Sequence, residues 1–215
     1  MVALFLSLTT IFFGSQNLDP TEIADRVQAV YDKEECISSE FVQIYISGTS
    51  GASVEESGKL SLKKPGKMRW EYQNPDAKYY ISDGEIVYWY VPADGQVTTL
   101  DLDSADQEQA QILFLMGRGD LSRDFKVSFT EEFQKLHPES FLLKFVPEKE
   151  QSFDYLVMEI NPKDYYVERL MSVDPLGNIM EYRFLNIRQD NIDDRYFTFE
   201  IPKGVEVISG NQGDQ

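Results

Sequence analysis

The sequence predicts a mainly β protein, in which a single, strongly curved antiparallel sheet of about 11 strands forms an incompletely closed barrel. A lid of α-helices is expected to cover the opening. Short runs of alternating apolar and polar residues, many separated by turn signals, follow one another from residue 40 onward. Helical spacing is found near residues 20–31 and 104–118. No Pro-, Gly- or Ser-rich linker and no repeat divides the chain, so we expect one domain whose wide sheet curls to hide its apolar face.

The first helix has a well-marked beginning at Pro20. Asp19 can act as its N-cap, proline suits the first helical position, and Glu22 follows Asp19 at the spacing of a capping box. Apolar residues then recur at helical spacing and indicate one stripe that faces the sheet as part of the lid: Ile23, Val27, Val30 and Tyr31.

The clearest hairpin signal is the Asp83-Gly84 pair between two β-like runs. Asp-Gly favours a two-residue type I′ turn, in which Ile81 pairs with Ile86 and Tyr79 pairs with Tyr88. Cross-strand partners share a face of the sheet, so the hairpin predicts one apolar surface. Together with the two strands before it, this surface gives the residues expected to line an apolar cavity: Leu60, Leu62, Met68, Trp70, Tyr72, Tyr79, Ile81, Ile86, Tyr88 and Tyr90.

A second helix is expected within residues 104–118, because Ser104 is a plausible cap and Gly117 a plausible C-terminal stop. Its apolar last turn supplies further lid residues: Leu113, Phe114 and Met116. The remaining runs with β-like alternation are expected to be strands at 96–101, 125–130, 140–146, 154–160, 165–173, 178–187 and 195–200.

The N-terminus carries an apolar run, Val2–Gly14, that is too short to span a membrane as a helix and is followed by polar residues. We interpret residues 1–16 as a signal peptide, with a frayed apolar tail as the alternative. The folded domain is then expected over residues 17–209 and a flexible tail over 210–215. No lipidation motif surrounds Cys36, which follows two glutamates. The mature chain is therefore expected to be exported and unlipidated.

The composition argues against several classes of function. The formal net charge of −17 makes nucleic acid a poor partner. One cysteine and one histidine, His137, leave little for a metal site. Motifs of the common hydrolases, nucleotide-binding loops and zinc proteases are missing from the sequence, so we expect no enzymatic activity. A pair of carboxylates that meets only in space would escape such a search, so a secreted hydrolase stays an alternative.

An apolar sheet face covered by helices suits either a dry core or a site for an apolar ligand. Residues 58–92 favour the ligand site. They contain Gly58-Lys-Leu, a Lys-Lys-Pro corner at 63–65, an aromatic strand around Trp70, Asn74-Pro75 and a Ser-Asp-Gly hairpin at 82–84. This order is similar to that of the outer-membrane lipoprotein carrier family, LolA, and the closing segment 197–205 (FTFEIPKGV) resembles it too.

The resemblance implies a half-barrel whose cavity holds lipoprotein acyl chains. It implies a periplasmic chaperone that needs no cofactor, works as a monomer, and moves its cargo from an inner-membrane ABC-type release complex to an outer-membrane receptor lipoprotein. Met68 and Trp70 match cavity-facing positions of the family. Lys64 stands where other members have an arginine that hydrogen-bonds to the lid and helps transfer, although lysine lacks the planar fork of arginine. A lipid-binding sensor or another lipid carrier of the same fold is the nearest alternative.

Overall fold

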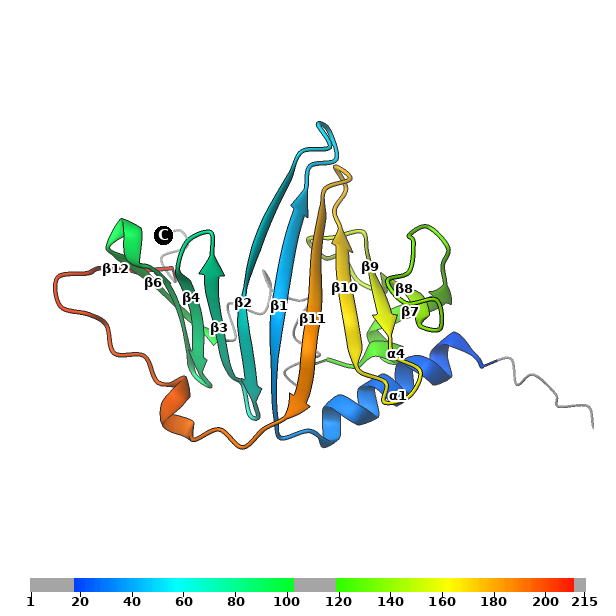
Figure 1. Cartoon of the computed structure of the whole chain (residues 1–215), viewed down its shortest axis with the longest axis horizontal. Helices are drawn as coiled ribbons and strands as arrows, with labels where there is room; N and C mark the ends of the chain where they lie inside the picture. Colours follow the sequence, from blue (N-terminus) through cyan, green and yellow to red (C-terminus); the bar gives the residue numbers. More distant parts are fainter. Residues whose placement is uncertain (1–17, 103–118, 211–215) are drawn as a thin grey trace, which may run out of the picture.

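The computed structural model describes residues 18–102 and 119–210 of the chain (Figure 1). The first half contains α1 (Pro20–Lys33), β1 (Cys36–Ile46), β2 (Ser53–Lys63), β3 (Lys67–Asn74), β4 (Lys78–Asp83), β5 (Ile86–Val91), η1 (Pro92–Asp94) and β6 (Gln96–Asp101). The second half contains α4 (Leu121–Asp124), β7 (Phe125–Phe129), β8 (Phe141–Pro147), β9 (Tyr155–Ile160), β10 (Val167–Val173), β11 (Ile179–Gln189), η3 (Asp194–Phe197) and β12 (Glu206–Ser209).

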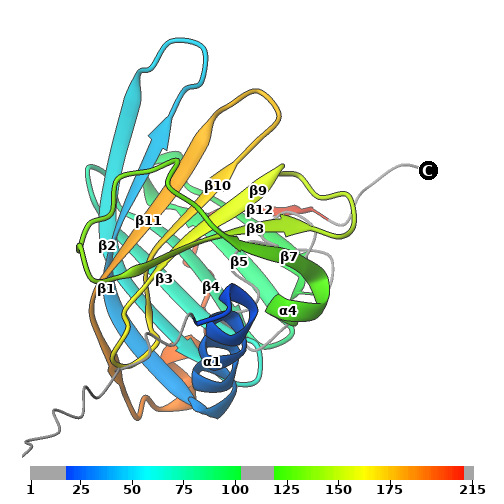
Figure 2. The same cartoon turned by 90° about the vertical axis from the view of Figure 1, so that its right-hand side faces the viewer.

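All the described strands belong to one 12-stranded sheet in the order β12-β6-β5-β4-β3-β2-β1-β11-β10-β9-β8-β7. β7 and β12 lie at its two ends and do not pair, so the curled sheet stays open (Figure 2). The expected strongly curved, incompletely closed antiparallel sheet is confirmed, with 12 described strands in place of about 11. One pairing departs from it, because β12 runs parallel to β6.

The predicted first helix is confirmed as α1, with the Asp19 side chain accepting a hydrogen bond from the Thr21 amide. Glu22 does not complete a capping box; its carboxylate pairs with Arg26 one turn later, at 2.6 Å. Ile23, Val27 and Tyr31 are buried, and Val30 is half-buried. The expected apolar stripe therefore packs against the rest of the molecule.

The sheet has two covered faces. The inner face packs against α1, and its buried residues form the main core cluster with the helix, including Phe41, Leu60, Trp70 and Leu170. The outer face is covered by residues 130–140 at one side and by residues 190–205, which we call the outer strap, at the other (Figure 1). Leu142, Val157 and Met171 form a second, smaller buried cluster on that face.

The expected strand at 195–200 is wrong. Residues Asp194–Phe197 form a short 3-10 helix within the outer strap instead. The aromatic alternation that suggested a strand has another cause: Phe197 is fully buried, while Tyr196 and Phe199 contact side chains of the sheet. The closing strand lies further along, at β12.

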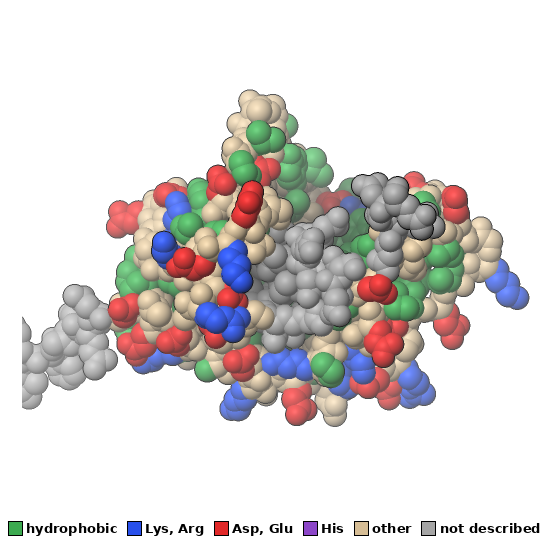
Figure 3. Space-filling view, turned by 180° about the vertical axis from the view of Figure 1, so that it is seen from behind, with side chains coloured by type: hydrophobic (Ala, Val, Ile, Leu, Met, Phe, Trp, Pro, Cys, Tyr) green, Lys and Arg blue, Asp and Glu red, His purple; other side chains and the backbone are tan. Residues whose placement is uncertain are grey.

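Two hairpins project beyond the sheet at the end away from α1 (Figure 1). They are the turn between β1 and β2 and the turn between β10 and β11. Exposed apolar side chains there include Tyr45, Val54 and Leu176. Figure 3 shows hydrophobic side chains gathered at this projection, whereas charged side chains are spread over the rest of the same side.

Candidate functional site

The inner face of β2 and β3 carries half of the residues predicted to line a cavity. Trp70 pairs directly with Leu60, and Met68 pairs with Leu62 across the same two strands. These side chains are at most 7% exposed, and so is Tyr72. All five belong to the core cluster that includes α1. The structure therefore brings Leu60, Leu62, Met68, Trp70 and Tyr72 together on one surface.

The hairpin residues of the same prediction lie on the opposite face. Trp70 pairs with Tyr80, so the inner face continues through Tyr80 and Trp89 and not through Tyr79 or Tyr90. Tyr88 and Tyr90 instead contact Phe199 of the outer strap. The outer-face residues of the predicted set are Tyr79, Ile81, Ile86, Tyr88 and Tyr90. Both faces of this hairpin are apolar because each one is covered, and alternation alone could not separate them.

The predicted register of the hairpin is also wrong by two residues. Tyr79 pairs with Tyr90 and Ile81 with Tyr88, which leaves a connection longer than two residues. The Asp83 carboxylate accepts hydrogen bonds from the amides of Glu85 and Ile86, both at 2.9 Å. This aspartate therefore stabilises a wider turn than the type I′ turn that Asp-Gly favours.

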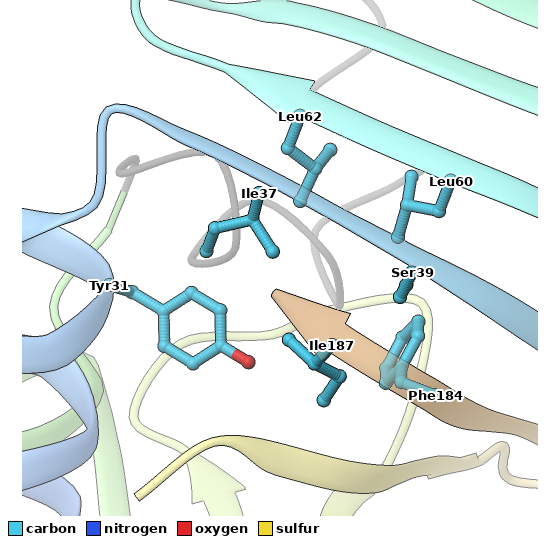
Figure 4. Close-up of a pocket in the computed structure, with 7 residues that line it drawn as sticks. All are labelled: Tyr31, Ile37, Ser39, Leu60, Leu62, Phe184 and Ile187. Atoms are coloured by element: carbon cyan, nitrogen blue, oxygen red, sulfur yellow. The ribbon is translucent and has the colours of Figure 1, made fainter. Parts of the chain in front are cut away.

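A small apolar pocket lies between α1 and the inner face (Figure 4). Its volume is about 10 Å³, and its walls are Tyr31, Ile37, Ser39, Leu60, Leu62, Phe184 and Ile187. A cavity of this size holds at most one water, whereas ligand pockets measure about 300–1,000 Å³. The pocket marks the junction between helix and sheet, and a ligand larger than a water molecule fits it only if the two separate.

Aromatic rings surround this junction in edge-to-face contacts. The Trp70 ring centroid lies 4.8 Å from that of Phe41, 5.3 Å from that of Tyr182 and 6.3 Å from that of Phe184. Among the described residues, none accepts a hydrogen bond from the Trp70 indole nitrogen Nε1, which is buried. The inner face thus combines apolar bulk with an unused donor.

A polar border closes the inner face toward the projecting hairpins. The Tyr72 hydroxyl donates to the Gln43 side chain at 2.6 Å, and Lys78 pairs with Glu56. The Lys78 ammonium also lies 4.9 Å from the centre of the Tyr72 ring. Burial raises the pKa of Tyr72 above its ordinary value of 10.0, so its hydroxyl stays neutral at physiological pH.

Polar contacts also hold α1 in place, including those of Gln28 and Asp25 with α4. Lys64 donates from Nζ to the carbonyl of Tyr31 in the last turn, the kind of lid contact that the resemblance implies for this position. The Tyr31 hydroxyl accepts from the Val167 amide at 3.2 Å, and Arg26 donates to the Tyr165 hydroxyl at 2.7 Å. Desolvation raises the pKa of Tyr31. The remaining lid residues predicted from the sequence, Leu113, Phe114 and Met116, lie outside the described residues, as do the proposed signal peptide and residues 211–215.

Comparison with known proteins identifies the family. Residues 32–200 match the model of the outer membrane lipoprotein carrier protein LolA. This chain belongs to the LolA family. Proteins named outer-membrane lipoprotein carrier protein from Pseudomonas paraeruginosa and Azotobacter vinelandii are each 28% identical to it. Each alignment covers 95% of this chain and 96% of the relative.

A solved structure has the same fold as this LolA family member. An uncharacterised conserved protein from Thermus thermophilus superposes with a TM-score of 0.56, over 87% of this chain and 97% of its own. The two sequences are 15% identical, so this similarity concerns the fold alone.

Several residues of the LolA-type inner face escaped the sequence analysis. Ser39, Phe184 and Ile187 line the pocket from β1 and β11, and Tyr80 and Trp89 extend the aromatic surface. Period-two alternation in β1 and β11 could have suggested Ser39 and Phe184, since Phe41 and Phe184 pair directly. Within the described residues there is no cluster of three or more His, Cys, Asp or Glu side chains fit to hold a metal ion, and no helix is long and apolar enough to cross a membrane.

Proposed function

We propose that this chain is a periplasmic carrier that holds lipoprotein acyl chains against its inner face and delivers them to the outer membrane. The observation that carries the proposal is the continuous apolar surface from Tyr31 of α1 to Trp89 of β5, inside a sheet whose ends do not pair. Membership of the LolA family supports it, as do relatives that match over nearly their whole length and bear the carrier name.

The energetics of opening fit a carrier. Each buried methylene contributes about 0.8 kcal/mol, so a dozen methylenes contribute about 10 kcal/mol. The opposing cost is the separation of α1 from the inner face, where the pocket of about 10 Å³ already marks an imperfect fit. The polar contacts that must break include those of Lys64, Arg26 and Tyr31. They also include the contacts of Gln28 and Asp25 with α4. Burial of the acyl chain thus offsets the cost of exposing the buried α1 side chains, among them Ile23 and Val27.

The direction of transfer belongs to the same proposal. The carrier would take its cargo from an inner-membrane ABC-type release complex and give it to a receptor lipoprotein where one exists, as a monomer and without a cofactor or an enzymatic step. A surface with net charge −17 is repelled by anionic headgroups, which favours exchange with proteins over adsorption to the bilayer.

The test uses one substitution on each face of the sheet. Leu62→Asn places an amide on the inner face, and Ile81→Asn places the same amide on the outer face, where the side chain is also buried. Binding is followed by fluorescence of an apolar dye and by its displacement with a triacylated peptide. Because a polar group buried against an acyl chain goes unsatisfied, we expect Leu62→Asn to weaken binding about tenfold. Ile81→Asn should bind as wild type.

Circular dichroism at the titration temperature checks that both variants are folded, and Leu62→Ala with Ile81→Ala serve as a milder pair. Equal binding losses on the two faces, or no binding by the wild type, would contradict the proposal. Turnover of an ester substrate by the wild type would instead favour a secreted hydrolase.

A further inference from the structure

One row of side chains crosses the inner face and combines apolar bodies with polar tips. Directly paired residues of β1 to β6 form it in the order Ser39, Leu60, Trp70, Tyr80, Trp89 and Thr98. Five of these six side chains carry a hydroxyl or an indole N–H. A core that only excludes water gains nothing from such groups, because each one must be satisfied or costs free energy.

Trp70 is the member of this row whose polar group, the indole N–H, lacks a hydrogen-bond acceptor among the described residues. Its side chain is 3% exposed, and among the described residues no acceptor receives its Nε1 hydrogen. Its described neighbours are aromatic rings and aliphatic side chains, including Leu60, which lines the pocket beside α1. Buried indole N–H groups usually find a partner. An unpaired donor beside a junction that opens for a ligand is suited to an acceptor that the ligand brings.

Acyl chains differ in whether they carry such an acceptor. A hydrocarbon tail has none, but an ester- or amide-linked chain has a carbonyl oxygen at one end. The polar border of the inner face, with the Lys78–Glu56 pair and Gln43, lies on the same strands as the row. A chain that points its methyl end toward α1 would place its linkage between the border and the helix, near Trp70.

We propose that the Trp70 indole N–H donates a hydrogen bond to the carbonyl oxygen of an ester- or amide-linked acyl chain, so that the inner face selects the linkage as well as the tail. The inference rests on the proposed carrier function and adds to it a preference for carbonyl-linked lipids over hydrocarbon or ether-linked ones. Trp70 acts as a binding residue with two separate parts, the ring for burial and the N–H for recognition.

The experiment compares two ligands and two variants. The ligands are a diacyl lipid with ester linkages and its dialkyl analogue, in which ether linkages join chains of equal length. Trp70→Phe keeps an aromatic ring but removes the donor, and Tyr88→Phe removes a hydroxyl from the outer face as the matched control. Wild type should prefer the ester lipid. Trp70→Phe should lose about fivefold in that preference, the value of one neutral hydrogen bond, and Tyr88→Phe should lose none.

A second measurement does not depend on a variant of Trp70. In ¹⁵N-tryptophan protein the two indole N–H signals are assigned with Trp89→Phe, and each lipid is then added to the wild type. The ester lipid should move the Trp70 signal downfield relative to the ether lipid. An unchanged ester preference in Trp70→Phe, or identical shifts with both lipids, would overturn the inference while leaving the carrier function standing. Absence of binding of both lipids to the wild type would overturn the two together.

Discussion

The inner and outer faces of this sheet are both covered, but the balance of apolar and polar contacts differs between them. On the inner face, apolar and aromatic side chains meet α1 around a pocket of about 10 Å³. On the outer face, the strap lies over a polar pocket of about 340 Å³ whose walls include Ser38, Glu40, Lys59 and Asp190. Apolar contacts are not directional and tolerate sliding, whereas ion pairs and hydrogen bonds fix a segment in one place. The outer covers are suited to stay, and the inner cover is suited to leave.

The buried ion network on the outer face gives the largest expected effect. Arg169 contacts Glu181 at 2.9 Å and Glu159 at 3.6 Å, and it donates to the carbonyl of Gln134 in the segment that covers the face. Arg169→Ala leaves the Glu159 carboxylate buried without a cation and leaves Glu181 with Arg183 alone. We therefore expect a loss of about 3–5 kcal/mol in the free energy of unfolding, measured with guanidinium chloride.

Arg183 supplies the matched control, because it pairs with the same Glu181 but its side chain is 39% exposed. Arg183→Ala should cost about 1 kcal/mol or less. Similar losses in both variants, or weaker lipid binding in a folded Arg169→Ala protein, would remove the distinction between a fixed outer face and an active inner one.

Two adjacent lysines at the end of β2 allow the cover of the inner face and the cover of the outer face to be weakened separately. Lys64 donates to the Tyr31 carbonyl of α1, and Lys63 donates to the Ile192 carbonyl of the outer strap at 2.6 Å. Lys64→Ala should lower the free energy of unfolding by about 1.5 kcal/mol, the value of a hydrogen bond from a charged donor. It should also speed hydrogen exchange of the α1 amides and the release of bound lipid.

Lys63→Ala should speed exchange in the strap and leave α1 and lipid release unchanged. Lys64→Arg keeps a donor and should behave nearly as wild type. If the two alanine variants affect the same amides, the helix and the strap are not independent covers.

Acid gives the smallest expected effect, and in the outer strap it can be followed at two carboxyl groups. Asp194 contacts Lys63 and Lys67, each at 2.6 Å, and hydrogen bonds from these lysines lower its pKa. Arg195 lowers the pKa of Asp193 from 3.8 to about 2. A depressed carboxyl pKa contributes stability that is present above its ordinary value and is lost as the pH falls through the folded value. Strap amides should therefore exchange faster between pH 3.8 and about 2.

Asp194→Asn should show this faster exchange already at neutral pH, with a smaller further change in acid that comes from Asp193. Both carboxylates are solvent-exposed and screened, so global stability should change little. Loss of α1 protection in the same pH range would contradict the assignment of these pairs to the strap.

Local sequence patterns were sufficient to predict most helices and strands, but not to predict which face of the sheet each side chain occupies. Asp19 and Pro20 correctly placed the start of α1, and alternation correctly placed Leu60, Met68 and Trp70 on one surface. Alternation could not tell which surface of the β4–β5 hairpin continues from Trp70, because both are apolar. That choice depends on the strap, which is distant in sequence.

The pocket was beyond sequence reasoning for a similar reason. Tyr31, Ile37 and Ile187 come from three elements, and their meeting depends on the pairing of β1 with β11. The unused donor of Trp70 was also invisible, since an indole N–H looks the same in a sequence whether or not an acceptor is near it. The family resemblance suggested the proposed role of this face, and the structure showed which side chains lie on it.

The order of strands also has a consequence for how the chain reaches its folded state. β1 pairs with β2 through a short turn. The other edge of β1 pairs with β11, which is much later in the chain, so that Ile37 lies opposite Gln189. Closing so long a loop is entropically costly and slows folding. Until β11 is available, an eleven-residue strand presents a bare edge to other chains. A chain truncated just before residue 179 should therefore be most prone to aggregate. A chain long enough for β1 to pair with β11 should be least prone.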